Sequence, residues 1–315
     1  MTAIPTFKDV LEASRRIKSY VYRTPVLTNT TLNVMTGATL FFKCENFQKV
    51  GAFKARGACN AIFSLSAAEA HHGVITHSSG NHGAALAYAA GLRGIPAIVV
   101  MPENAPAVKR AAVAGYGARI VTSGSNPLDR ETMLEQTLAE TGATFVHPSN
   151  DPRVIAGQGT AALEFLEEVP DLDIVITPVG GGGLLAGTAL AVAGRGVGTR
   201  TMAAEPEAVD DAYRSFRDGR IYPPTNAKTI ADGLCTFLGE VNFPIIRQSV
   251  SDIVTVSEEA IVRAMRLVWE RMKLIIEPSA AVPVAALLEP KIAIEGLRVG
   301  VILSGGNVDL DHLPW

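Results

Sequence analysis

An apolar run that leads into four glycines decides the fold of this chain: Asp173-Ile-Val-Ile-Thr-Pro-Val179 is followed by Gly180-Gly181-Gly182-Gly183. The run is typical of a buried β-strand, and the residues after it, Leu184-Leu-Ala-Gly-Thr-Ala-Leu190, are typical of an α-helix. Glycines at this junction leave backbone N–H groups uncovered at a helix N-terminus, which is an anion-binding arrangement. The stretch therefore predicts an α/β fold with a phosphate site at the end of a strand.

The chain on both sides of the glycines alternates between apolar runs and helical patterns. Predicted strands span residues 39–43, 74–77, 96–101, 118–122, 144–147, 173–179, 201–205 and 299–303, and predicted helices span 7–17, 84–90, 107–114, 129–141, 159–168, 184–190 and a segment capped by Ser257. This alternation with short loops is typical of an open parallel sheet with helices on both faces. Because 315 residues are many for one core, we predict two lobes, with residues 73–149 forming a smaller lobe inserted between parts 1–72 and 150–315 of a larger one.

Composition limits the partners and the compartment that we expect. The net charge of −3, without basic runs, argues against nucleic acid and against an acidic membrane surface. Three cysteines without metal-binding spacing are typical of a reducing cytosol. The N-terminal residues do not resemble a signal peptide, and no apolar run reaches the roughly 18 residues of a membrane span. We therefore predict a cytoplasmic protein that binds neither nucleic acid nor membrane.

Three glycine-containing loops are predicted at the carboxyl ends of strands, namely residues 78–83, 180–183 and 304–307. Ligands collect at this edge of an open parallel sheet, so the three loops are expected to surround one site. One alternative is a dinucleotide site, because Gly181-x-Gly183-x-x-Ala186 and the later Glu205 imitate a nicotinamide fingerprint. That alternative leaves the other two loops and the glycine-flanked Lys54 without a role.

The second alternative is a pyridoxal phosphate site, which requires an amine, a phosphate cup and polar groups around a pyridine ring. The motifs that carry it are Gly51-Ala-Phe-Lys54-Ala-Arg-Gly57, Ser78-Ser-Gly-Asn-His-Gly83, the four glycines with Leu184, and Ser304-Gly-Gly-Asn307. In order and spacing they resemble the serine racemase and serine/threonine dehydratase family over nearly the whole chain. The resemblance implies the tryptophan-synthase-β-like fold, or fold type II, with two lobes that each contain an open, mostly parallel sheet flanked by helices.

The resemblance also implies the residues that hold the cofactor. Lys54, preceded by Phe53, would form the Schiff base with pyridoxal 5′-phosphate and then act as the base at the substrate's α-carbon. Gly180 to Gly183 with Leu184 would bind the phosphate through backbone N–H groups. Asn81 would hydrogen-bond the 3′-oxygen of the ring. Ser304 would face the pyridine nitrogen, and a hydroxyl there leaves this nitrogen largely neutral, which favours elimination over transamination.

Substrate contacts are implied in the same way. The backbone amides of the loop before the predicted helix would bind the substrate carboxylate, which involves Ser78, Ser79, Gly80, Asn81 and His82. Ser79 matches the second acid/base of serine racemases, on the face opposite the lysine. Arg130 and Thr236 match positions near the far end of the substrate, where the family has a serine in place of Thr236.

A divalent cation is implied beside the active site. In Glu205-Pro-Glu-Ala-Val-Asp-Asp211, the resemblance gives the carboxylates of Glu205 and Asp211 and the carbonyl of Val209 as ligands. Oxygen ligands of this kind suit Mg²⁺, Ca²⁺ or Mn²⁺.

The predicted activity is β-elimination of water from L-serine or L-threonine, giving a 2-oxo acid and ammonia, with serine racemisation as a further activity that the family implies. An alternative activity is the dehydration of 3-hydroxyaspartate to oxaloacetate. The extra carboxylate of this substrate requires a cation such as Lys109, Arg110 or Arg130. A non-catalytic protein that binds pyridoxal phosphate remains a third alternative. Resemblance to the short racemase and dehydratase branch also implies a homodimer.

Overall fold

The structure is a computed structural model that describes residues 3–195, 198–223, 228–289 and 291–315. Its larger sheet has six strands in the order β1-β2-β10-β7-β8-β9. They are β1 (Val26–Thr28), β2 (Thr39–Cys44), β10 (Arg298–Leu303), β7 (Ile174–Pro178), β8 (Arg200–Pro206) and β9 (Asp252–Val256). All neighbours are parallel except β1 and β2, which are antiparallel.

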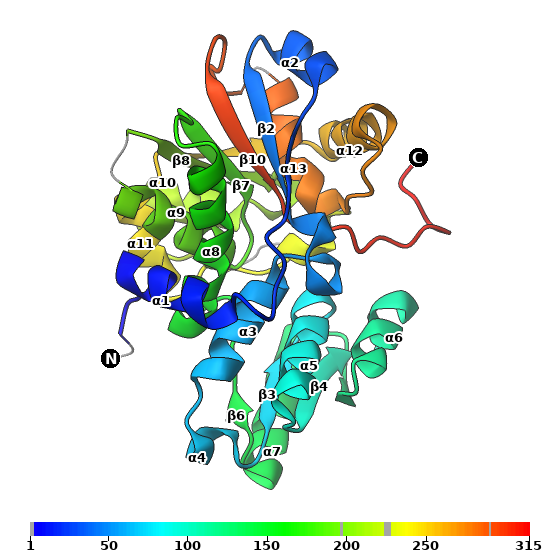
Figure 1. The fold of residues 1–315 in the computed structure, drawn as a ribbon. Helices are drawn as coiled ribbons and strands as arrows, with labels where there is room; N and C mark the ends of the chain where they lie inside the picture. Colours follow the sequence, from blue (N-terminus) through cyan, green and yellow to red (C-terminus); the bar gives the residue numbers. More distant parts are fainter. Residues whose placement is uncertain (1–2, 196–197, 224–227, 290) are drawn as a thin grey trace.

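The smaller sheet has four parallel strands in the order β5-β4-β3-β6. They are β5 (Arg119–Ser123), β4 (Ala97–Pro102), β3 (Val74–His77) and β6 (Thr144–Phe145), and they alternate with α5 (Asn81–Arg93), α6 (Ala107–Gly115) and α7 (Pro127–Thr141). Figure 1 shows this sheet with its helices as the lower part of the molecule and the six-stranded sheet above it. The chain therefore has an α/β fold with two open, mostly parallel sheets, as the sequence predicts.

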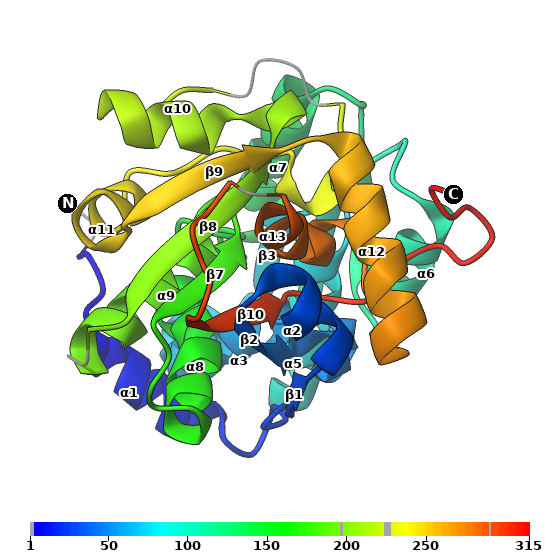
Figure 2. The ribbon, with the colours of Figure 1, turned by 90° about the horizontal axis from the view of Figure 1, so that it is seen from above.

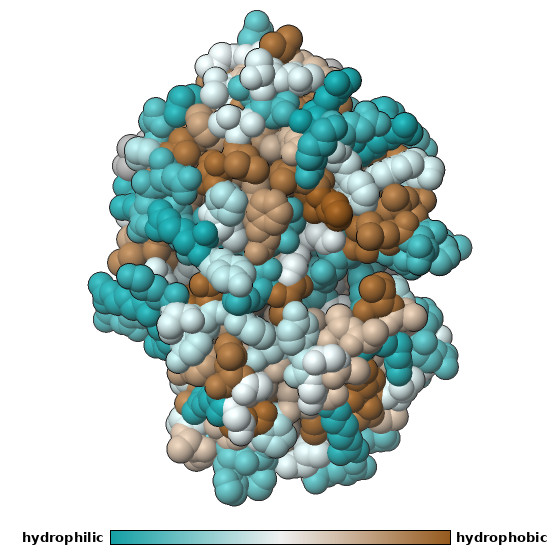
Figure 3. Space-filling model, turned by 45° about the vertical axis from the view of Figure 1, so that its right-hand side comes forward, coloured by the Kyte–Doolittle hydropathy of each residue, from teal (hydrophilic) through white to brown (hydrophobic). Residues whose placement is uncertain are grey.

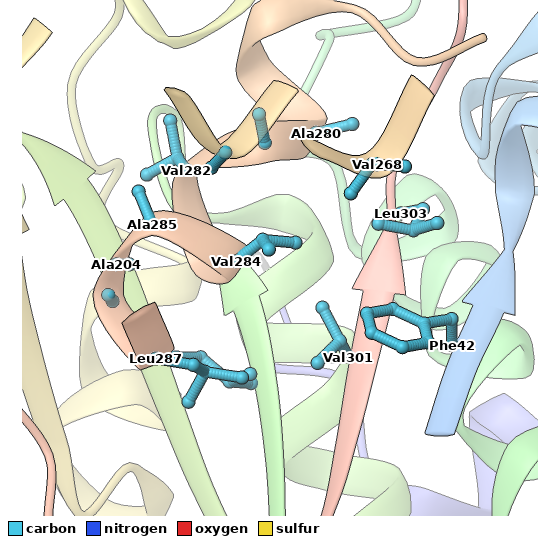
Figure 4. Close-up of a cluster of buried hydrophobic side chains, with 14 of the residues drawn as sticks. Phe42, Ala204, Val268, Ala280, Val282, Val284, Ala285, Leu287, Val301 and Leu303 are labelled. Carbon is cyan, nitrogen blue, oxygen red and sulfur yellow. The ribbon is translucent and has the colours of Figure 1, made fainter. Parts of the chain in front are cut away.

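Helices cover both faces of the larger sheet. One group contains α1 (Phe7–Ile17), α8 (Pro152–Glu168) and α9 (Gly183–Arg195), and the other contains α12 (Glu258–Met272) and α13 (Pro278–Leu288). Figure 2 shows the two groups on opposite sides of the strands. In Figure 4, Val284 of α13 lies near Val301 of β10, and Phe42 of β2 completes the same apolar cluster.

The helix that begins at the predicted catalytic lysine joins the two parts. Helix α3 (Lys54–Ser64) packs against α5 beside the smaller sheet and against α8 beside the larger one. The remaining helices are α2 (Thr30–Thr36), α4 (Ala67–Ala70), α10 (Asp211–Asp218) and α11 (Asn242–Ser249). Lobe boundaries at residues 72/73 and 149/150 remain a prediction, and α3 shows that the contact between the lobes is extensive.

Most predicted elements are present, with some different ends. Helix α5 begins at Asn81 and α8 at Pro152, earlier than predicted, because glycines inside both helices obscured their start. Strand β6 ends at Phe145, two residues short of the prediction. Eight of the described strands and α-helices were not predicted, namely β1, β9, α2, α3, α4, α10, α11 and α13. Among them, α13 is a buried helix that is apolar on every side and shows no helical period.

Two further observations concern the length of the helices and the cysteines. None of the helices in the described part of the chain is long and apolar enough to cross a membrane. Cys44, Cys59 and Cys235 form no disulfide.

Candidate active site

One pocket, with about 1010 Å³ of space that includes its open mouth, is lined by residues from elements of both sheets. The residues that the family resemblance assigns to catalysis, cofactor or substrate all line it: Phe53, Lys54, Ser78, Ser79, Gly80, Asn81, His82, Arg130, Gly180, Gly181, Gly182, Gly183, Leu184, Thr236 and Ser304. The structure thus brings these residues together, while their individual roles remain predictions.

Lys54 places its amine in the wall of the pocket at the first residue of α3. Its Nζ donates a hydrogen bond of 2.9 Å to the carbonyl of Pro148. Burial lowers the pKa of Lys54 to about 8, against the opposing effect of the Glu277 carboxylate. A neutral amine is therefore accessible near neutral pH, as a nucleophile or a general base requires.

The four glycines form a loop whose positions have no room for side chains. A Cβ on Gly180 would lie 2.8 Å from the Leu234 Cα, and one on Gly181 would lie 2.4 Å from the Ser149 Oγ. Gly182 has a φ of +77°, which L side chains rarely adopt. Helix α9 begins at Gly183, so the backbone N–H groups of the loop stand uncovered at a helix N-terminus. This cradle fits the phosphate of pyridoxal phosphate.

The N-terminus of α5 and the last loop of the chain form two further walls. The Gly80 N–H donates to the Ser78 Oγ over 3.1 Å, which tightens the turn before the helix. His82 is buried, and burial holds the pKa of its imidazole well below its usual range, so the ring is neutral. On the other side, the Phe53 N–H donates to the Ser304 carbonyl over 3.0 Å, which ties the lysine segment to the final loop.

Glu277 is a residue of this pocket that the sequence analysis missed. Only 5% of it is exposed, and the Asn81 amide donates to its two carboxylate oxygens over 2.9 and 3.1 Å. Asn307 in turn donates to the Asn81 Oδ1 over 3.0 Å, so the orientation of the Asn81 amide is set from both sides. Burial raises the pKa of Glu277 to about 7. Its sequence signal was slight: a single carboxylate before Pro278, between apolar residues.

The three cations considered for a second substrate carboxylate have different surroundings. Lys109 lines the pocket but forms an ion pair with Asp232. Arg110 donates to the Pro102 carbonyl and to Thr122, and it is not among the lining residues. Arg130 lines the pocket, and within the described residues its buried Nε has no hydrogen-bond partner.

The histidines near Arg130 do not compete with it for an anion. Burial, followed by the charge of Arg130, lowers the pKa of His77 to about 3. Burial likewise lowers the pKa of His147 to about 4. Both rings are therefore neutral at physiological pH, and the guanidinium of Arg130 is the charged donor at this end of the pocket.

Glu205 and Asp211 lie fully buried at the end of β8 and the start of α10. Both carboxylate oxygens of Asp211 lack a partner in the described structure, and Glu205 accepts only the N–H groups of Ala212 and Tyr213. Burial and then the charge of Asp211 raise the pKa of Glu205 well above its usual range, while burial raises the pKa of Asp211 to about 7. Unpartnered carboxylate oxygens fit a divalent cation, and a buried Glu205 does not fit the ribose-binding role of a dinucleotide site.

Comparison with known proteins agrees with this geometry. The family model described as "Pyridoxal-phosphate dependent enzyme" matches residues 17–305. A β-hydroxyaspartate dehydratase of Paracoccus denitrificans is 53% identical over 99% of both chains. An L-threo-3-hydroxyaspartate ammonia-lyase of Saccharomyces cerevisiae is 51% identical over 98% of this chain and 94% of its own. The crystal structure of serine racemase from Dictyostelium discoideum superposes with a TM-score of 0.93 at 49% identity, covering 98% of this chain and 100% of the other. The chain therefore belongs to the family of pyridoxal-phosphate dependent enzymes, with the fold of their type II members.

Proposed function

We propose that this enzyme eliminates water from β-hydroxy amino acids, and that 3-hydroxyaspartate is its preferred substrate, with oxaloacetate and ammonia as products. The observation that carries the proposal is the guanidinium of Arg130, which lies in the same pocket as the Lys54 amine and whose buried Nε has no hydrogen-bond partner among the described residues. Two close relatives named for hydroxyaspartate support this substrate. Of the activities that the sequence predicts, the proposal therefore takes 3-hydroxyaspartate dehydration, which was the alternative to dehydration of L-serine or L-threonine.

The residues of the pocket divide the chemistry among them. When bound, pyridoxal phosphate supplies an electron-withdrawing ring that makes the α-proton of the substrate removable. The uncovered amides at the start of α5 would bind the α-carboxylate. Lys54 would take the α-proton, the Cβ–O bond would break, and the hydroxyl would leave with a proton as water. One water is then consumed when the C–N bond is hydrolysed, so the net products are a 2-oxo acid and ammonia.

Arg130 tests the choice of substrate. Replacing Arg130→Met removes the charged donor for the second carboxylate but keeps a long side chain. We expect kcat/KM for L-threo-3-hydroxyaspartate to fall about 100-fold, as for the loss of one buried charged hydrogen-bond partner. The value for L-serine, which has no second carboxylate, should change far less. A 2-oxo acid assay on both substrates measures, for each, the ratio of the kcat/KM of the variant to that of the parent.

Arg110→Met is the matched control, because it removes a neighbouring cation that does not line the pocket. This control variant should have nearly the same kcat/KM as the parent for both substrates. Equal losses on the two substrates in the Arg130 variant would contradict its role in selecting a dicarboxylate. Absence of oxaloacetate formation by the parent enzyme would contradict the proposed substrate itself.

Serine racemisation is a second candidate activity, because Ser79 lines the pocket together with Lys54. A hydroxyl that can return a proton to the other face of the α-carbon would convert L-serine to D-serine. Support comes from the similarity to the Dictyostelium serine racemase. Formation of D-serine by the parent and not by a Ser79→Ala variant tests this activity.

We further propose that Glu205, Asp211 and the carbonyl of Val209 bind a divalent cation such as Mg²⁺, which would stabilise the larger lobe without joining the chemistry. Support comes from the unpartnered oxygens of Asp211.

A cytoplasmic homodimer is the last part of the proposal. Its support is the resemblance in sequence together with exposed apolar side chains on the larger lobe, among them Val34 at 79% and Leu310 at 61% exposure. Figure 3 shows apolar patches across this part of the surface. Light scattering on the purified protein should report twice the 33.2 kDa mass of one chain.

A further inference from the structure

Residues 147–150 touch both ends of the cofactor site. The Pro148 carbonyl accepts the hydrogen bond from the Lys54 amine. The next residue, Ser149, packs against the glycine loop so closely that a Cβ on Gly183 would lie 3.0 Å from its carbonyl oxygen. The position of this segment therefore sets the distance between the reactive amine and the phosphate cradle.

Asn242, the first residue of α11, fastens this segment to the glycine loop. Its side chain is fully buried, and its Nδ2 donates to the Gly181 carbonyl over 2.8 Å and to the Ser149 carbonyl over 3.2 Å. Its Oδ1 accepts the Gly239 N–H over 3.0 Å. One amide thus uses both donors and its acceptor to join three loops that are far apart in the sequence.

The hydrogen bond to Gly181 has a directional consequence. In a planar trans peptide the C=O of one residue and the N–H of the next point in opposite directions. The Gly181 carbonyl points toward Asn242, so the N–H of Gly182 points away from it, and Gly182 lines the pocket. The glycines have no side chains that could hold the peptide between Gly181 and Gly182 in one orientation, so its orientation depends on hydrogen bonds to its backbone.

We propose that Asn242 is a positioning residue for the cofactor phosphate: it orients the peptides of the glycine loop and keeps the loop against the segment that holds Lys54. Asn242 lies outside the set of pocket-lining residues, so it acts through Gly181 and Ser149. The inference rests on the glycine loop holding the phosphate.

The experiment compares pyridoxal phosphate with pyridoxal, which lacks the phosphate. The cofactor-free full-length enzyme is titrated with each compound, and the change in visible absorbance gives the two Kd values. In the Asn242→Ala variant the Kd for pyridoxal phosphate should rise about tenfold or more, as expected when hydrogen bonds that orient a binding loop are lost. The Kd for pyridoxal should stay within about twofold of the parent value. The Kd for pyridoxal divided by the Kd for pyridoxal phosphate should therefore fall. Neutral replacements are used because an aspartate would repel the phosphate directly.

Asn150→Ala is the matched control. The Asn150 Oδ1 accepts the Val241 N–H over 2.9 Å, so it braces the same turn from the other side, and its hydrogen bond goes to Val241 and not to the glycine loop. We expect this variant to lose thermal stability while the ratio of the two Kd values stays at that of the parent. Thermal melting of each variant reports its folding, and Asn242→Ser, which retains one donor, replaces the alanine variant if that variant does not fold.

If Asn242→Ala raises the Kd values for pyridoxal phosphate and pyridoxal by the same factor, or raises neither, the role of Asn242 in positioning the phosphate is overturned. If the parent itself binds pyridoxal as tightly as pyridoxal phosphate, the assignment of the glycine loop to the phosphate fails instead. The two failures are therefore distinguishable.

Discussion

The buried carboxylate of Glu277 raises the pKa of the buried amine of Lys54. Burial lowers the pKa of Lys54 to about 8, and the negative charge of Glu277 holds it above the value that burial alone would produce. Glu277 also fixes the amide of Asn81, so its influence on the pocket is both electrostatic and geometric. No motif marks Glu277; its role follows from the fold, which places this residue, just before α13, against Asn81 at the start of α5.

The rate at which the cofactor-free enzyme captures pyridoxal phosphate should depend on this pair. Only the neutral amine attacks the cofactor aldehyde, so the rate should rise with pH and level off above about 8. Glu277→Gln removes a charge that raises the pKa of Lys54, and the midpoint should therefore move to lower pH. Stopped-flow absorbance at a series of pH values measures the midpoint.

Glu103→Gln, on the exposed surface of the smaller lobe, serves as the control and should leave this midpoint unchanged. A midpoint that stays in place or rises in the Glu277 variant would contradict the electrostatic coupling. Capture of the cofactor by Lys54→Ala with parental absorbance would contradict the role of the lysine.

At the scale of elements, the turn from β8 into α10 brings the buried carboxylates of Glu205 and Asp211 together. Neither forms an ion pair among the described side chains, and the charge of Arg214 only partly opposes the rise in the pKa of Asp211. The pKa values of Glu205 and Asp211 are both raised. In the absence of metal, this turn is therefore more stable when the two carboxyl groups are protonated. The sign follows from linkage: this contribution is full below the unfolded pKa of about 4 and is lost as pH rises toward the folded value. A divalent cation would remove the loss by pairing with the ionised oxygens.

We therefore expect Mg²⁺ to raise the melting temperature more at pH 8 than at pH 5. Asp211→Asn removes one of the two charges, so the metal-free variant should be more stable than the parent at pH 8 by about 1–3 kcal/mol and should lose the response to Mg²⁺. Thermal melting with Mg²⁺ and with a chelator measures both effects.

Glu207→Gln changes an exposed residue of the same turn and should retain the response. An Asp211 variant that still responds to Mg²⁺ like the parent would contradict the proposed ligand.

At the scale of the whole molecule, a buried cluster of charges joins segments that the chain separates by more than a hundred residues. The Arg56 guanidinium binds Glu45 on one side and Glu164 of α8 on the other, over 2.7 to 2.9 Å. Lys43 of β2 binds the same Glu164 over 2.9 Å. Because Arg56 lies two residues after Lys54, this cluster also holds the start of α3 in place.

Breaking the cluster should destabilise the entire fold. Glu164→Gln leaves Arg56 and Lys43 with less negative charge in a buried site, which we expect to reduce the free energy of unfolding by about 3–5 kcal/mol. Glu167→Gln on the same helix is the matched control, because its ion pair with Arg23 is exposed and should contribute less than about 1 kcal/mol. Denaturant titration of both variants measures the difference, and equal losses would contradict the importance of the buried cluster.

Prediction from the sequence succeeded where a local pattern carries the information. Strand β7, the four glycines and helix α9 are neighbours in the chain, so period and glycine content sufficed to predict them. At α13, prediction failed because the information is not local. Helix α13 is apolar on all sides, and its identity as a helix is decided by burial between the sheet and α12.

Local patterns and the order of the motifs were enough to predict the α/β fold, the cofactor family and those pocket residues that lie in the motifs. Only the tertiary structure decided which groups are free to act. Arg130 and Lys109 look alike in the sequence, but Lys109 forms an ion pair with Asp232, whereas the buried Nε of Arg130 has no hydrogen-bond partner among the described residues. Glu277 and Asn242 likewise acquire their surroundings from segments distant in the chain. Charge, burial and hydrogen bonding depend on what lies nearby in space, and that proximity arises only when the chain folds.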